Sequence, residues 1–341
     1  MALTAAQALH KLLARADLTH GEMLEVMHQI MHGEYTSAQM AGVLVALRMK
    51  GETVDEIAAA AEVMRALSTK VEVATDEHLV DTCGTGGDGI QTFNVSTVSA
   101  FVAAAAGARV AKHGGRSVSS TCGSADVLEA LGINVNLTPA QVARCVDDIG
   151  IGFMFAPNHH SAMKHAAPVR RELGVRTLFN LLGPLTNPAG AKRQVMGVFD
   201  KNLTGKLARV LQQLGSEHVL VVHGADGMDE ISFAGDTYVA ELKSGEVTEY
   251  VLNPQQFGMG LHQAESIRVQ NAGESKAMIL AVLAGQPGPA RDIVLLNAGA
   301  AIYVAGVADS LQAGIAKATQ VIDNHAASER LKQLVRLSAE L

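Results

Sequence analysis

The chain has 341 residues, which is long enough for about two domains and a large hydrophobic core. Its formal net charge of −7 gives no electrostatic basis for binding nucleic acid or an anionic membrane surface. There is no signal-peptide core, no apolar run of membrane-spanning length, and no metal-ligand spacing among the three cysteines. We therefore expect a soluble, cytoplasmic protein with no nucleic-acid or membrane partner.

Residues 1 to about 70 repeat one local pattern, a Thr followed three positions later by Gln or Glu. This is the capping box that opens a helix, and apolar residues after each box recur at helical spacing. The four pairs are Thr4 and Gln7, Thr19 and Glu22, Thr36 and Gln39, and Thr53 and Glu56. The segment predicts a small helical unit without visible chemistry. Its methionines at positions 23, 27 and 31 indicate packing or a subunit interface rather than a cofactor site.

From residue 71 onward, strand and helix patterns alternate, which predicts a mainly parallel sheet with helical crossovers. The expected strands are Leu79–Cys83, Ala108–Lys112, Ile133–Asn136, Ile151–Phe155, Gln194–Phe199 and His218–His223. The expected helices are 94–106, Ala125–Leu131, one opened by Thr138 and Pro139, Leu203–Leu214, and most of 272–341. Thr237–Leu242 and Val247–Leu252 flank a Ser-Gly turn and predict a hairpin.

The segment from Asp81 to Thr97 predicts a strand, a glycine-rich loop and a helix. Its glycines allow the backbone to approach a ligand closely. Asn94, Ser96 and Thr97 would stand at the helix N-terminus, where the helix dipole favours an anion. The spacing differs from both the dinucleotide fingerprint and the Walker loop. We therefore expect a phosphate-rich ligand, with a plain structural turn as the alternative.

Other loops after predicted strands also carry polar residues, and ligands of such sheets bind at the carboxyl ends of the strands. Residues 112–120 supply two cations and several hydroxyls, which suit phosphate oxygens, although a solvated basic loop is the alternative. Asp229 and Glu230 stand in a glycine-flanked loop that suits Mg2+, although such a pair taken alone is more often just solvated. His159 and His160 lack further ligands at metal-binding spacing, so a metal site is disfavoured there.

These motifs together resemble the anthranilate phosphoribosyltransferases over nearly the whole chain. The matching stretches are Asp81–Thr97, Lys112–Asp126, Phe153–Arg170, Arg176–Pro188 and Gly227–Ile231. The resemblance implies the phosphoribosyltransferase and nucleoside phosphorylase type of fold, with a small helical domain hinged to an α/β domain. It implies a helical domain of residues 1–70 joined by roughly 168–190, an α/β domain of 71–167 and 191–341, and a homodimer formed through the helical domain.

The resemblance also implies a reaction and the residues that carry it. The phosphoribosyl group of phosphoribosyl pyrophosphate (PRPP) would pass to the amine of anthranilate, as a step of tryptophan biosynthesis, with two Mg2+ ions per active site. The implied PRPP contacts are Gly84, Gly87, Asp88, Thr92, Asn94, Val95, Ser96, Thr97, Lys112, His113, Gly114, Gly115, Arg116, Ser117, Val118, Ser119, Ser120 and Ser124. The implied anthranilate contacts are Gly84, Gly115, His160 and Arg170.

Ser96, Asp229 and Glu230 are the implied Mg2+ ligands, and Lys112 joins the two carboxylates as an implied catalytic residue. The commonest motif of the family has Asn where this chain has Gly115, so no side-chain contact to anthranilate is available there. An aromatic amine is unprotonated at neutral pH, so catalysis would depend on positioning and on stabilising the pyrophosphate leaving group.

Two alternatives stay open at this point. A pyrimidine nucleoside phosphorylase would use phosphate as nucleophile and need no Mg2+, and the acidic residues at 229 and 230 argue against it. A non-catalytic, nucleic-acid-binding relative should be basic and lack part of the glycine-rich motif. The acidic composition and the complete motif argue against that alternative.

Overall fold

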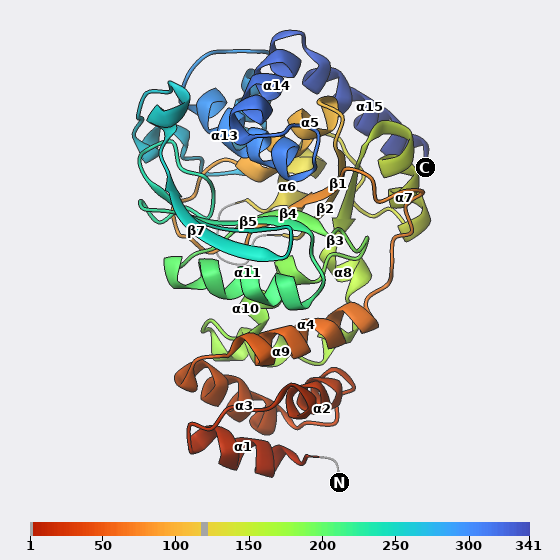
Figure 1. Ribbon diagram of the computed structural model, residues 1–341. Coiled ribbons are helices and arrows are strands. Elements are labelled where there is room, and N and C mark those ends of the chain that lie inside the picture. The colour runs from red at the N-terminus through yellow and green to blue at the C-terminus, as the bar shows by residue number, and fades with distance from the viewer. Residues whose placement is uncertain (1–2, 117–121) are drawn as a thin grey trace.

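The computed structural model describes residues 3–116 and 122–341 and shows a stack of helices joined to an α/β domain (Figure 1). The first helices are α1 (Ala5–Leu13), α2 (His20–Met31), α3 (Ser37–Lys50) and α4 (Val54–Leu67). Each of them begins with the predicted capping box, because the Thr side chain accepts a hydrogen bond from the third helical residue. The predicted methionine stripe is buried inside this unit, which confirms that it serves packing.

A mainly parallel sheet forms the centre of the α/β domain, as predicted. In the described residues its strand order is β3-β2-β1-β4-β5-β6-β7. The parallel strands are β1 (Leu79–Thr82), β2 (Arg109–Gly114), β3 (Ile151–Phe155), β4 (Arg193–Gly197) and β5 (His218–Gly224). β6 (Thr237–Lys243) and β7 (Glu246–Leu252) form the predicted antiparallel hairpin. Ser244 and Gly245 in its turn both have positive φ, as a tight hairpin requires.

The strand expected at Ile133–Asn136 is wrong. Ile133 and Val135 are buried in the core, so the alternating pattern does report a buried face. The backbone of this segment, however, is hydrogen-bonded to a side chain and not to a neighbouring strand, because Asn134 N donates to Ser338 Oγ at 3.2 Å. Alternation alone cannot separate a strand from an extended segment packed beside the sheet.

Helices cover both faces of the sheet (Figure 1). On one side lie α5 (Val95–Ala105), α13 (Pro289–Val304), α14 (Leu311–Asp323) and α15 (Ala326–Glu340). The remaining helices of the α/β part are α6 (Ser124–Ala130), α7 (Pro139–Ile149), α8 (Ala156–His159), α11 (Thr204–Gln213) and α12 (Ala272–Leu283). None of the helices in the described part of the chain is both long and apolar enough to cross a membrane.

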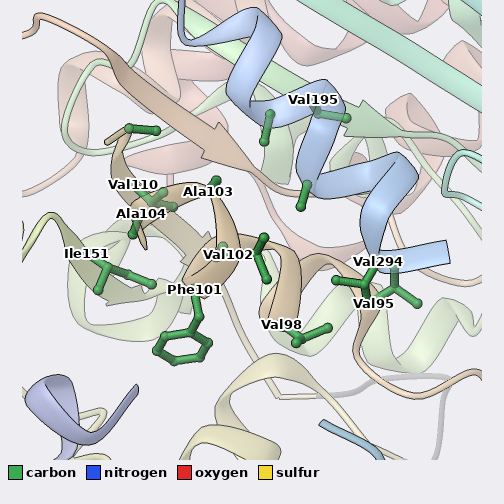
Figure 2. Close-up of a cluster of buried hydrophobic side chains, with 14 of the residues drawn as sticks. Val95, Val98, Phe101, Val102, Ala103, Ala104, Val110, Ile151, Val195 and Val294 are labelled. Atoms are coloured by element: carbon green, nitrogen blue, oxygen red, sulfur yellow. The ribbon is translucent and has the colours of Figure 1, made fainter. Parts of the chain in front are cut away.

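The core of the α/β domain is built from small and branched apolar side chains. Val98 and Phe101 of α5 lie in one cluster with Val294 of α13 and with Val110 and Val195 of the sheet (Figure 2). The start of α5 is thus fixed between the sheet and the C-terminal helices. Because α5 follows the glycine-rich segment, this packing fixes the end of that segment as well.

A mid-chain segment returns to the helical stack. It contains α9 (Ala167–Leu173), which contacts α3, and α10 (Phe179–Leu182), which contacts α4. Arg65 of α4 ties the parts together, because its Nε donates to Leu185 O at 2.6 Å and its Nη1 donates to Leu214 O at 3.1 Å. The helical stack, the returning segment and the end of α11 therefore meet at one half-buried guanidinium.

Candidate active site

The glycine-rich loop (residues 83–94) and the acidic pair (Asp229 and Glu230) meet at the carboxyl edge of the sheet. Gly86 N donates to Asp229 Oδ2 at 2.8 Å, across 143 positions of the sequence. Ser96 N, in the first turn of α5, donates to Glu230 Oε1 at 3.1 Å. The two segments predicted to bind phosphate and Mg2+ are thus brought together, and the carboxylate of Glu230 lies at the helix N-terminus.

Lys112 reaches the same place from β2. Its Nζ donates to Thr82 O and, at 3.2 Å, to Ser96 Oγ, and the residue is only 4% exposed. Within the described residues it forms no ion pair, so its hydrogen-bond acceptors are neutral oxygens, while the charges of Asp81 and Glu230 lie near enough to interact with it. A buried ammonium held in this way is well placed to stabilise an incoming anion.

The acidic pair is oriented by the backbone and perturbed by its surroundings. Burial raises the pKa of Asp229, and the nearby charge of Asp88 raises it further. Burial also raises the pKa of Glu230, and the charge of Asp229 adds to that effect. Adjacent carboxylates that repel one another in this way favour a bound cation.

The donor set fits a hard divalent ion. Asp229, Glu230 and the hydroxyl of Ser96 supply oxygen, the ligand type that Mg2+ prefers. Within the described residues no group of three or more His, Cys, Asp and Glu side chains could hold a metal by itself. Substrate phosphate oxygens and water would therefore complete the coordination, as is usual for Mg2+.

The residues that flank Ser96 take structural positions. Asn94 does not cap α5 with its side chain; its Oδ1 instead accepts from Ser275 Oγ at 2.7 Å. Val95 is buried in the core. Thr97 is buried too, and its Oγ1 has no hydrogen-bond partner in the described part of the chain. Ser96 is thus the residue of this group that contacts both the acidic pair and Lys112.

The predicted contacts within the glycine-rich loop are spread along it. A Cβ at Gly84 would lie 2.7 Å from Asp229 Oδ2, so the loop backbone packs directly on the acidic pair. Asp88 Oδ1 accepts from the backbone N of residue 90 at 3.1 Å, and Thr92 forms an isolated bridge with Arg268. Gly87 has positive φ, which a glycine adopts at little cost.

The loop after β2 is tied to the start of α6. A Cβ at Gly114 would lie 2.3 Å from Ser124 Oγ, so a larger residue here would force the Ser124 side chain to move. Gly115 has open space around it, and its carbonyl accepts from Ser124 Oγ at 3.3 Å and from Ala125 N at 3.1 Å. That carbonyl, a possible acceptor for the substrate amine, is therefore already engaged. The predicted contacts Ser117, Val118, Ser119 and Ser120 lie outside the described residues.

Arg116 points toward α6. Its Nη1 donates to Asp126 Oδ1 at 2.8 Å and to Glu129 Oε2 at 2.7 Å. These two carboxylates compensate the guanidinium charge. In this arrangement Arg116 anchors the base of the loop, and Lys112 is the cation that faces the acidic pair.

His113 and His160 form a buried pair, with Nε2 atoms 3.2 Å apart. Burial lowers the pKa of His113 to about 3 and that of His160 to about 4, so both rings are neutral at pH 7. One ring must therefore donate and the other accept. In the described residues neither Nδ1 has a partner, while His159 bonds to Thr69 O at 2.9 Å through its own Nδ1.

Arg170 lies on α9, in the segment that returns to the helical stack. Its guanidinium stands 5.4 Å from the centre of the Phe179 ring, and it makes no hydrogen bond or ion pair within the described ranges. Partial burial lowers its pKa, although an arginine stays charged. An unpaired guanidinium of this kind suits a substrate carboxylate.

Residues to which the sequence motifs gave no role support the site from below. Asp81 Oδ1 accepts from His113 N at 3.1 Å, and its Oδ2 accepts from Asn187 Nδ2 at 2.7 Å. Burial raises the pKa of Asp81 to about 6. An acidic residue inside an apolar strand is the signal that could have identified it.

Arg176 stacks 4.0 Å from the Phe199 ring centre and donates to Gly87 O, which joins the returning segment to the glycine-rich loop.

The fold and this site define a class of enzyme, the glycosyltransferases built from a helical bundle and an α/β domain. Residues 6–68 match the helical bundle domain of the glycosyl transferase family, and residues 76–328 match its α/β domain.

Similarity to individual enzymes shows to which family within this class of glycosyltransferases the chain belongs. The chain is 68% identical to the anthranilate phosphoribosyltransferase of Methylobacillus flagellatus over 338 residues, covering 99% of each chain. The enzyme of that name from Thermus thermophilus superposes with a TM-score of 0.92 at 43% identity, covering 97% of this chain and 99% of that one. The enzyme from Saccharomyces cerevisiae in complex with PRPP and Mg gives a TM-score of 0.84 at 26% identity, with coverage of 99% and 94%. The chain belongs to the anthranilate phosphoribosyltransferase family.

Proposed function

We propose that this enzyme transfers the phosphoribosyl group of PRPP to the amine of anthranilate, with release of pyrophosphate, in tryptophan biosynthesis. The observation that carries the proposal is the convergence of Lys112, Ser96 and the acidic pair at the N-terminus of α5. This is an arrangement for binding a pyrophosphate group together with Mg2+, in a chain closely similar to enzymes of that name.

The residues on the phosphate side would act on the leaving group. We assign Mg2+ as the cofactor, two ions per active site, with Asp229, Glu230 and Ser96 as protein ligands. When bound, the ions would neutralise the pyrophosphate oxygens as the bond to the ribose breaks. Lys112 would hold its ammonium toward the same oxygens. Because Glu230 now accepts from Ser96 N, phosphate oxygens would compete with its carboxylate for the helix N-terminus.

The residues on the anthranilate side would orient the amine. We assign Arg170 to the anthranilate carboxylate and His160 to the wall of its subsite, with Gly84 and Gly115 as backbone neighbours. His113 and His160 are neutral, so neither repels nor attracts a charged group strongly. Positioning of this kind can supply a large part of the rate enhancement when no general base is needed.

At the level of assembly we propose a cytoplasmic homodimer that forms through the helical domain. Leu13 and Met49 are large apolar side chains of that domain, exposed by 68% and 73%. The division proposed is residues 1–70 with roughly 168–190 as the helical domain, and 71–167 with 191–341 as the α/β domain. The contacts of α9 and α10 with α3 and α4 support it.

One assay tests the function. Anthranilate fluorescence should disappear when PRPP and Mg2+ are both added to the enzyme, and persist when either is omitted. A double variant, Asp229→Ala with Glu230→Ala, should fold but lose turnover by at least about 100-fold, as expected when transition-state charge is left unbalanced. Undiminished turnover by the double variant, or turnover without Mg2+, would contradict the proposal. Cleavage of a pyrimidine nucleoside by phosphate would favour the phosphorylase alternative.

A further inference from the structure

β4 ends at Gly197, a residue outside the motifs singled out in the sequence, and its backbone lies directly against the acidic pair. A Cβ at position 197 would stand 1.5 Å from Asp229 O and 2.3 Å from Asp229 C. Ordinary contacts begin at 3.4 Å. No side chain can therefore occupy this position unless the backbone that carries the acidic pair moves.

The same residue also holds the glycine-rich loop. Gly197 O accepts two hydrogen bonds from Thr85, one from its N at 2.8 Å and one from its Oγ1 at 3.3 Å. The loop in turn contacts Asp229, because Gly86 N donates to Asp229 Oδ2 at 2.8 Å. The end of β4, the glycine-rich loop and the acidic pair are thus packed with backbone against backbone around Gly197.

We propose that Gly197 is a positioning residue that sets the separation between the glycine-rich loop and the acidic pair. This inference rests on the proposed function, in which the two segments hold the pyrophosphate group and Mg2+ together. A Cβ would displace Asp229 by an ångström or more, and Glu230, the next residue, would move away from Ser96 N. A displacement of about 1 Å at such a site can weaken function by about 100-fold.

The test compares Gly197→Ala with a control glycine in the same sheet. Gly152 in β3 is crowded too, although less than Gly197, since its Cβ would lie 2.8 Å from a Val146 methyl and 2.9 Å from Val142 O. Titration calorimetry would measure PRPP binding in the presence and absence of Mg2+, and thermal unfolding would report stability. We expect Gly197→Ala to weaken Mg2+-dependent PRPP binding by about 10- to 100-fold. Gly152→Ala should lower stability and leave that affinity unchanged.

A second variant covers the case in which Gly197→Ala does not fold. Thr85→Val keeps the side-chain volume and removes only the Oγ1 hydrogen bond to Gly197 O, so it should weaken Mg2+-dependent PRPP binding by a few fold. Parent-like affinity in Gly197→Ala, or in Thr85→Val where Gly197→Ala does not fold, would overturn the inference. So would an equal loss of affinity in Gly152→Ala. If the parent enzyme itself does not bind PRPP with Mg2+, the proposed function fails, and the inference fails with it.

Discussion

Single residues at this site take their charge state from their surroundings more than from their chemical type. Burial pushes the acids Asp229 and Glu230 toward the neutral form and holds the rings of His113 and His160 neutral. Lys112, surrounded by backbone and hydroxyl oxygens, supplies positive charge at the same edge of the sheet. The site is therefore arranged to gain stability when a polyanion and a cation enter together.

The histidine pair predicts a pH dependence of stability. Both folded-state pKa values lie below the ordinary value of about 6.5, so the unfolded chain binds more protons as the pH falls below that value. As the pH falls from 6.5 to its folded pKa, each ring thus lowers the free energy of unfolding by up to about 1.4 kcal/mol per pH unit. The raised pKa values of the acidic pair act in the opposite direction, because there the folded state binds more protons. The measurement must therefore compare the pH dependence of the free energy of unfolding in the parent with that in a variant that lacks one of the two rings.

His160→Gln removes one of the two rings. Urea denaturation at pH 7, 6 and 5 should show the parent losing more stability than this variant as the pH falls. His10→Gln, at an exposed position of α1, is the control and should follow the parent. Parallel curves for all three proteins would mean that His160 is not held neutral in the folded state.

Arg170 predicts a selective effect on one substrate. A charge-assisted hydrogen bond contributes about 1.5–3 kcal/mol, so Arg170→Ala should raise KM for anthranilate by about 10- to 100-fold. KM for PRPP should move much less. Arg171→Ala, at the exposed neighbouring position on α9, should leave both constants near the parent values. Equal increases in both constants for Arg170→Ala would contradict the assignment of Arg170 to the anthranilate carboxylate.

At the scale of elements, the sequence was informative wherever the signal is local. The capping boxes, the hairpin turn and the loops after strands involve residues a few positions apart, and the structure confirms these elements. The segment at 133–136 is not the strand that its pattern predicts, because burial on one face leaves the same alternation in a strand and in a packed extended segment. The roles of Gly197 and Asn187 could not be predicted, because they depend on which strands become neighbours. No local pattern places β4 beside β1.

Opposite effects are expected for substitutions at two adjacent glycines, Gly114 at the end of β2 and Gly115 just after it. Gly115 has open space and no positive φ, so Gly115→Asn should preserve kcat within about twofold and leave KM for anthranilate unchanged or slightly lower. Gly114→Ala places a Cβ against Ser124 Oγ and should cost about 1–3 kcal/mol of stability. Steady-state kinetics and thermal unfolding of both variants provide the measurement. An inactive Gly115→Asn enzyme would show that the backbone of this chain requires glycine there.

At the scale of the whole molecule, side-chain hydrogen bonds join the helical stack and the returning segment to the α/β domain. Arg65 donates to carbonyls from the returning segment and from the end of α11, and Arg176 reaches from that segment to Gly87 O in the glycine-rich loop. The segment that carries the candidate anthranilate contact Arg170 is thus connected both to the helices and to the candidate phosphate site. A shift of the helical stack relative to the sheet would move the two substrate sites relative to each other.

The exposed apolar side chains of the helical domain lead us to expect that it forms the dimer interface. Leu13 and Met49 expose large apolar surfaces, and replacing each with Glu should weaken a dimer by placing charge in its interface. Sedimentation velocity should then show a parent dimer and a shift toward monomer in Leu13→Glu and Met49→Glu. Leu280→Glu, on α12 and exposed by 42%, is the control and should remain dimeric.

The turnover of the monomeric variants shows whether the dimer is needed for catalysis. The contacts that join Lys112, Ser96 and Glu230 all lie within one chain, so a monomeric variant should keep its Mg2+-dependent turnover at low temperature. Its thermal stability should fall, because the apolar surface that the dimer buries would return to water. A parent that sediments as a monomer, or variants that remain dimers, would place the interface elsewhere on the molecule. Loss of turnover in a folded monomer would mean that the partner subunit completes the site.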